Sequence, residues 1–116
     1  MTTKYVPTGE RQWFSANVRG TEMAGATLWN EGFGLSTRVF RMPKGMVISQ
    51  HRHDVFVQVA VLSGRMHIDE GDRTMGPGDV YFIHPGQTHV ETALEDTEVM
   101  VTKQEPDPAD SQNRLN

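Results

Sequence analysis

The chain contains no cysteine, and this absence removes several kinds of chemistry at once. Without a thiol there is no disulfide, no thiolate metal ligand and no cysteine nucleophile. The net charge of −4 is spread along the 116 residues, with no basic stripe of the kind that binds nucleic acid. No apolar run approaches the ~20 residues that span a membrane, and the N-terminus lacks the apolar centre of a signal peptide. We therefore expect a cytoplasmic protein that binds neither nucleic acid nor membranes.

Glycine and proline are plentiful by contrast, with 11 and 6 copies that separate short runs rich in valine, isoleucine, phenylalanine and threonine. This punctuation is typical of an all-β protein, and many short strands at such spacing favour a sandwich or barrel. A chain of this length forms one domain. We predict that residues 1–104 form this domain and that residues 105–116 form a polar, mobile tail. The expected strands are 25–29, 35–42, 47–51, 55–62, 65–68, 79–83, 88–93 and 98–103.

Three of the five histidines lie where one metal ion would need them. His51 and His53 are two residues apart, so on a regular strand both imidazoles share one face of the sheet. His89 follows an apolar strand and a Pro-Gly turn. Neutral imidazole binds iron, zinc, copper, nickel and manganese, so the three residues form a candidate metal site. The alternative is a barrel that keeps the histidines without binding a metal.

The two segments that carry these histidines resemble the paired motifs of the cupin superfamily. Residues 45–64 hold the glycine, the H-x-H pair and the closing glycine of the first motif, and residues 78–93 hold the glycine, a Pro-Gly turn and the histidine of the second. In the second motif His84 stands in place of the proline and Ala93 in place of the final asparagine. The resemblance implies a single-domain antiparallel β-barrel of the jelly-roll type. It also exposes a departure, because no glutamate stands in the first motif. Depending on how the spacing is counted, its place falls on Val57 or on Gln58.

Gln58 is therefore a candidate to touch the metal, its bound water or the substrate, and a polar group on the outer face is the alternative. If the alternating valines of this strand face inward, Gln58 faces outward unless a bulge after Asp54 reverses the pattern. Two further residues are candidates for catalytic roles. Tyr81 is the strongest polar contributor to a cavity wall, and His84 is either an acid or base at the cavity mouth or a surface histidine in a loop. Glu91 lies two residues beyond His89 and is either a distant fourth ligand, a general base or a rim charge.

Three neutral imidazoles leave the full charge of a divalent ion in place, which favours anionic ligands such as an enolate. The sequence is also similar, more loosely, to small cupins that cleave diketones and dihydroxyacetophenones with dioxygen. We therefore expect a mononuclear non-haem Fe(II) dioxygenase that acts on a small chelating enolate or diketone-like substrate, although Mn, Zn or Ni would also suit the site. A non-redox isomerase, lyase or cyclase and a non-catalytic binding protein are the alternatives. The resemblance also implies a homodimer.

Overall fold

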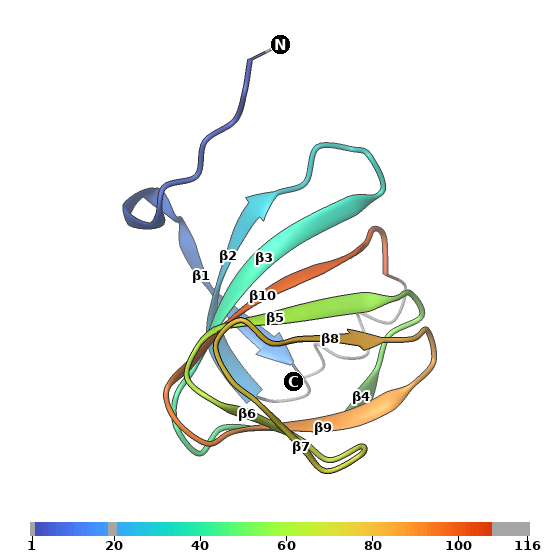
Figure 1. Ribbon diagram of the computed structural model, residues 1–116. Helices are drawn as coiled ribbons and strands as arrows, with labels where there is room; N and C mark the ends of the chain where they lie inside the picture. Colours follow the sequence, from blue (N-terminus) through green and yellow to red (C-terminus); the bar gives the residue numbers. More distant parts are fainter. Residues whose placement is uncertain (1, 19–20, 108–116) are drawn as a thin grey trace.

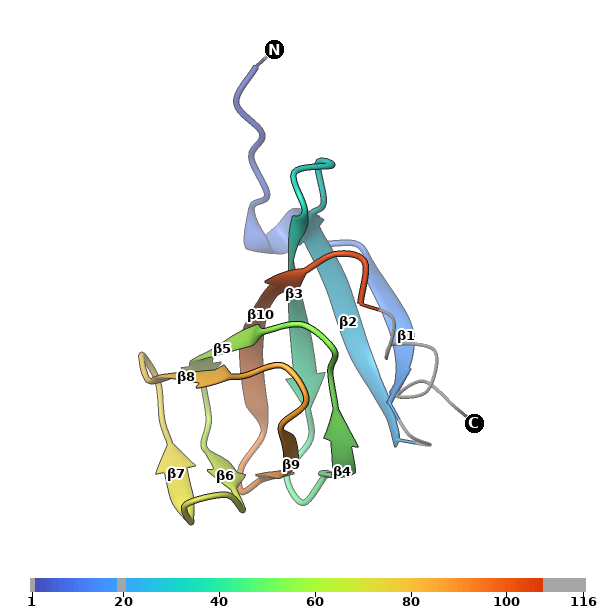
Figure 2. The ribbon, with the colours of Figure 1, turned by 90° about the vertical axis from the view of Figure 1, so that its right-hand side faces the viewer.

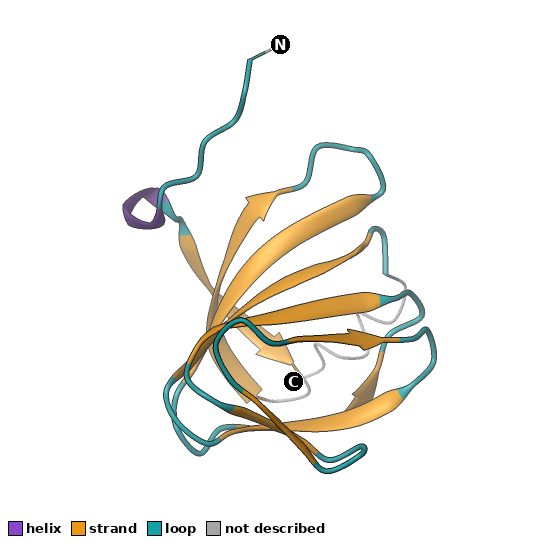
Figure 3. Ribbon diagram, viewed as in Figure 1, coloured by secondary structure: helices purple, strands orange, loops and turns teal. Residues whose placement is uncertain are grey.

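The structure is a computed structural model that describes residues 2–18 and 21–107, without the side chains of Val18 and His51. Within these residues the chain forms one short 3-10 turn, η1, and ten strands (Figure 3). Their bounds are η1 Thr8–Glu10, β1 Trp13–Val18, β2 Thr21–Trp29, β3 Leu35–Met42, β4 Val47–Arg52, β5 Val57–Ser63, β6 Met66–Ile68, β7 Arg73–Met75, β8 Val80–Ile83, β9 Thr88–Ala93 and β10 Thr97–Gln104. None of the described segments is a helix long and apolar enough to cross a membrane.

The strands form two antiparallel sheets that face each other across the interior (Figures 1 and 2). One sheet has the strand order β1-β2-β3-β10-β5-β8, and the other has the order β4-β9-β6-β7. Neighbours such as β3 and β10 are far apart in the sequence, so the sheets are closed by long-range pairing rather than by hairpins alone. The expected jelly-roll β-barrel is confirmed.

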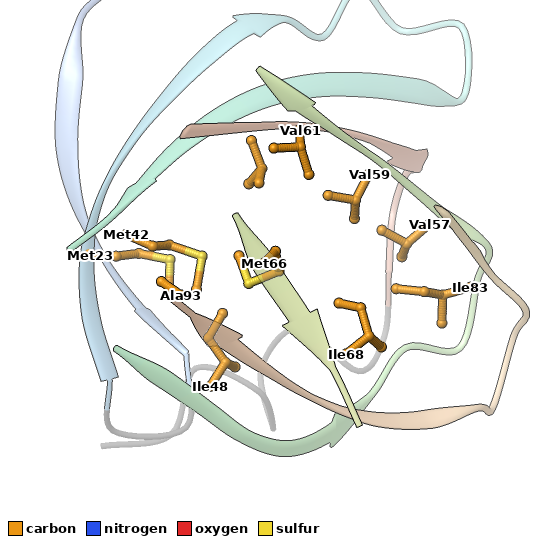
Figure 4. Close-up of a cluster of buried hydrophobic side chains, with 11 residues drawn as sticks. Met23, Met42, Ile48, Val57, Val59, Val61, Met66, Ile68, Ile83 and Ala93 are labelled. Carbon is orange, nitrogen blue, oxygen red and sulfur yellow. The ribbon is translucent and has the colours of Figure 1, made fainter. Parts of the chain in front are cut away.

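Strand periodicity explains where the core lies. In β5 the residues Val57, Val59 and Val61 are buried, whereas Gln58 between them is exposed. The same alternation in the other strands directs apolar side chains between the sheets, where they meet as one cluster (Figure 4). The buried cluster comprises Met23, Met42, Ile48, Val57, Val59, Val61, Met66, Ile68, Ile83, Ala93 and Val99.

All eight predicted strands are present, and β3 has the predicted bounds. Two strands were not predicted. Strand β1 lies at the end of its sheet and pairs only with β2, and its sequence lacks a clear alternation. Strand β7 has three residues, two of them exposed, which is too short a pattern to recognise. Strand β7 pairs with β6 as a hairpin.

The N-terminal segment is held on the barrel by a pair of arginines around one carboxylate. Arg11 Nη1 donates to Glu98 Oε1 at 2.9 Å, and Arg41 Nε donates to Glu98 Oε2 at 3.2 Å. The Arg41 guanidinium also lies 3.9 Å from the centre of the Trp13 ring. Partial burial acts to raise the pKa of Glu98, but the hydrogen bonds and charges of the two arginines outweigh it and hold the pKa below 4.5.

Candidate metal centre

A bulge in β4 decides which residues of this strand face β9. Ile48 pairs with Glu91 and His51 pairs with His89, so three steps along β4 match two steps along β9. Ser49 and Gln50 are both exposed inside this interval. Without the extra residue, the alternation from buried Ile48 would bring Gln50 opposite His89. The bulge thus places the backbone of His51 opposite His89, while the side chain of His51 lies outside the described part of the structure.

His53, in the segment after β4, and His89, in β9, line the same cavity. His89 is buried in β9 with 3% of its surface exposed, and His53 directly follows β4. Their ring centres are 6.4 Å apart and the ring planes differ by 25°. The backbone N–H of Gly86 donates to the carbonyl of His53 at 2.7 Å, which ties the segment after β4 to the turn before β9. Two of the three predicted imidazoles are therefore neighbours in the folded chain.

A carboxylate and a phenol extend this pair of histidines. Glu91 Oε1 lies 3.2 Å from His89 Nε2, and the Tyr81 hydroxyl donates to Glu91 Oε2. Burial, the negative charge of Glu91 and this hydrogen bond together raise the pKa of Tyr81 well above 10.0. Tyr81 is accordingly a neutral donor at physiological pH, and it fixes the orientation of the Glu91 carboxylate.

His53 contacts Asp107, the last residue that the structure describes. Asp107 Oδ2 lies 2.6 Å from His53 Nδ1 and 3.4 Å from Lys103 Nζ, while the Asp54 N–H donates to Asp107 Oδ1 at 3.2 Å. A carboxylate beside Nδ1 favours the tautomer that carries its proton there and leaves Nε2 available as a ligand. Residues 105–107, which we expected in a mobile tail, lie against the barrel, and residues 108–116 lie outside the described residues. Glu105 also contacts the barrel, through Ser36 Oγ at 2.6 Å and Arg38 Nη1 at 2.5 Å.

The cavity between the sheets has a volume of about 100 Å³ and a mostly apolar wall. Five charged or titratable side chains interrupt that wall, namely Arg38, His53, His89, Glu91 and Lys103. Ligand pockets commonly measure ~300–1,000 Å³, so this cavity suits a compound of few non-hydrogen atoms. Its polar groups are concentrated enough to orient such a compound.

Gln58 and His84 are placed away from the cavity and need correction, and Tyr81, which is not among the residues that line it, reaches it through its hydrogen bond to Glu91. Gln58 is exposed on the outer face of β5, because the bulge occurs in β4 and not after Asp54, so the inward alternation of the valines persists. Val57 occupies the inner position instead and lines the cavity. His84 is exposed after β8, where its ring contacts the edge of Phe82. Neither Gln58 nor His84 lies where it could bind the metal or act on a substrate in the cavity.

Sequence reasoning missed Lys103 and Asp107 and did not choose among three roles for Glu91. The position of Glu91, two residues beyond His89 on one strand, was a usable signal that both side chains share a face. Asp107 gave no such signal, since it lies 54 residues from His53 in a proline-flanked polar segment.

The donor set fits a divalent metal of the kind that binds imidazole. Neutral histidines and one carboxylate are ligands that iron, zinc, nickel and manganese accept. Among the side chains that the structure describes, which exclude that of His51, no group of three potential ligands is already arranged around one point. The ring centres of His53 and His89, 6.4 Å apart, would have to approach by about 1 Å to bind one ion in tetrahedral geometry.

A sequence model of the ChrR cupin-like domain family matches residues 1–107. The chain is a member of this family. The match spans both sheets and both histidine segments, so the cupin resemblance of the sequence is confirmed. No curated protein sequence matches the chain.

Solved structures agree on this cupin fold. The polyketide cyclase RemF from Streptomyces resistomycificus is 19% identical, with 92% of this chain and 82% of that chain covered and a TM-score of 0.77. A putative acetylacetone dioxygenase from Methylibium petroleiphilum is 15% identical, with 88% and 76% covered and a TM-score of 0.74. The complex of SigE with the anti-sigma ChrR from Rhodobacter sphaeroides gives 18% identity, 83% and 50% coverage and a TM-score of 0.67. At these identities the likeness establishes the fold and not the activity.

Proposed function

We propose that the protein is a metal-dependent cupin in which His51, His53 and His89 bind one divalent ion. The observation that carries this proposal is the convergence of two strands. His53 and His89 line one cavity, and the bulge in β4 sets the backbone of His51 opposite His89. Cross-strand partners of an antiparallel pair lie on one face of the sheet, which supports His51 as the third ligand.

We further propose that the metal is Fe(II) and that the reaction is the oxidative cleavage of a small chelating enolate or diketone. When bound, such an ion would supply Lewis acidity and the capacity to react with dioxygen. The mostly apolar wall disfavours bound water in the cavity. Arg38 and Lys103 line the cavity, but Glu105 and Asp107 pair with them, so the bound ion would supply the positive charge that favours an anionic substrate. The putative acetylacetone dioxygenase with the same fold supports this substrate class.

The test uses iron-loaded protein, acetylacetone as the probe diketone and an oxygen electrode. We expect oxygen uptake in step with loss of the diketone, and none from zinc-loaded protein. His53→Ala and His89→Ala should lose both the metal and the oxygen uptake. His67→Ala is the matched control, because that imidazole binds Asp72 at 2.7 Å in the β6–β7 hairpin and does not line the cavity.

A second candidate function is a non-redox reaction at the same centre, such as an isomerisation, elimination or cyclisation. The cyclase RemF favours it through its close structural likeness. Loss of the diketone without oxygen uptake, with zinc or manganese as well as iron, would support this candidate and refute the dioxygenase. Metal-loaded protein that binds the diketone but never converts it would favour a binding role. The match to the ChrR cupin-like family and the structural likeness to the anti-sigma ChrR support such a role.

A further inference from the structure

We propose that Glu91 supplies the carboxylate ligand that β5 does not provide, so that the metal centre has three imidazoles and one relocated carboxylate. This inference rests on the proposed metal site and adds to it a fourth ligand from an unexpected strand. It also changes the charge of the centre. A divalent ion with three neutral imidazoles keeps a charge of +2, whereas one carboxylate lowers it to +1.

Strand β5 carries no carboxylate. Of the two positions on which the motif's glutamate can fall, Val57 is 2% exposed and lines the cavity. Its neighbour Gln58 faces solvent. Of the described residues that line the cavity, only Glu91 carries a carboxylate. The cavity therefore has no carboxylate on its β5 wall and has one, that of Glu91, on its β9 wall.

The side chain of Glu91 is buried in the interior of the barrel. Its exposed fraction is 7%, and its neighbours across the sheet are Ile48 on β4 and Ile68 on β6. Placing a carboxylate among apolar residues is costly unless hydrogen bonds or a cation compensate it. Tyr81 donates one hydrogen bond to it, and a neutral phenol brings no charge. His89 Nε2 already faces the other oxygen, and a cation bound between these two atoms would add to the compensation.

The Oε1 atom of Glu91 and the Nε2 atom of His89 have the spacing of two ligands of one ion. Glu91 Oε1 and His89 Nε2 are 3.2 Å apart. Two ligands that each lie about 2.1 Å from one ion are separated by roughly 3.0 Å at a right angle and roughly 3.4 Å at the tetrahedral angle. The observed separation falls between these values. The pair therefore has the spacing of two adjacent ligands before any movement, and the imidazole of His53 has to move toward it.

The experiment measures Co(II) and Zn(II) affinity by competition with a chromophoric chelator. Wild-type protein is compared with Glu91→Gln, Tyr81→Phe and the double variant Val57→Glu/Glu91→Gln. We expect Glu91→Gln to bind at least tenfold more weakly and Tyr81→Phe to lose only a few-fold, since the carboxylate stays. The visible absorption bands of bound Co(II) should shift in Glu91→Gln and not in Tyr81→Phe.

The double variant returns the carboxylate to β5, and it should regain most of the lost affinity. A carboxylate on that strand could not replace one that merely orients His89, so this rescue separates a ligand from a positioning residue. Wild-type affinity and an unshifted Co(II) spectrum in Glu91→Gln would overturn the inference, whether or not the double variant folds. If wild-type protein binds no metal, the proposed function itself fails. If His89→Ala loses the metal but Glu91→Gln does not, only the relocated carboxylate is refuted.

Discussion

Asp107 connects the C-terminal segment to the candidate metal centre, and its replacement by asparagine gives a sharp prediction. The carboxylate accepts at both oxygens: Oδ1 bonds the Asp54 N–H, and Oδ2 faces His53 and Lys103. Its side chain has no exposed surface. An asparagine keeps one oxygen and turns an NH₂ group toward a donor whichever way the amide is oriented, so at least one of these contacts becomes repulsive.

The magnitude follows from the burial of the pair. Removing one partner of a buried ion pair costs ~3–5 kcal/mol, and the Nζ to Oδ2 distance of 3.4 Å is long for a charged hydrogen bond, so we expect about 3 kcal/mol. A domain with a free energy of unfolding of ~5–15 kcal/mol would stay folded after this loss. Urea denaturation in the presence of a chelator measures the change without any contribution from bound metal.

A double-mutant cycle isolates the contact. Asp107→Asn combined with Lys103→Met should be less destabilising than the sum of the single changes, with a coupling free energy of at least ~1 kcal/mol. Asp54→Asn is the matched control, because its carboxylate forms an exposed pair with Arg52 at 3.1 Å and should change stability by less than ~0.5 kcal/mol. An Asp107→Asn protein as stable as the control would refute the docking of residues 105–107 on the barrel.

Three further outcomes follow from the structure. Gly64→Ala should cost about 3 kcal/mol, because Gly64 has φ of 85° and an added Cβ would lie 2.3 Å from the Asp96 carbonyl oxygen; unchanged thermal stability would contradict this conformation. Glu98→Gln should remove stability that is fully present above pH 4.5, since the pKa of Glu98 is lowered on folding. The difference from wild type should then shrink as the pH falls through the folded pKa, and a difference that grows there would refute the sign. Gln58→Ala should leave metal affinity unchanged, because Gln58 is exposed on the outer face of β5. A tenfold loss of affinity would show that Gln58 takes part in metal binding.

Much of the fold could be predicted because its signals are local. The bounds of β3 follow from residues 35–42 themselves. The inward direction of the valines in β5 also follows from alternation, and it decides between Val57 and Gln58 once no bulge intervenes. These are properties of a strand and its neighbours along the chain.

The parts of the site that escaped prediction depend on pairing between distant segments. The bulge in β4 exists only relative to β9, so the sequence of β4 does not reveal it. The contact of Asp107 with His53 requires the chain to return across the barrel after β10. The homodimer, the metal and the roles of the three histidines stay predictions, and each depends on a partner that the single chain does not contain.

The most direct test of the central claim is elemental analysis of protein purified without added metal, followed by titration with Fe(II), Mn(II) and Zn(II). The account predicts about one divalent ion per chain in wild type and in His67→Ala, and none in His53→Ala or His89→Ala. Wild-type protein that carries no metal and binds none on titration would contradict it. Stoichiometric binding that persists in His89→Ala would contradict it equally, because the ion would then lie elsewhere.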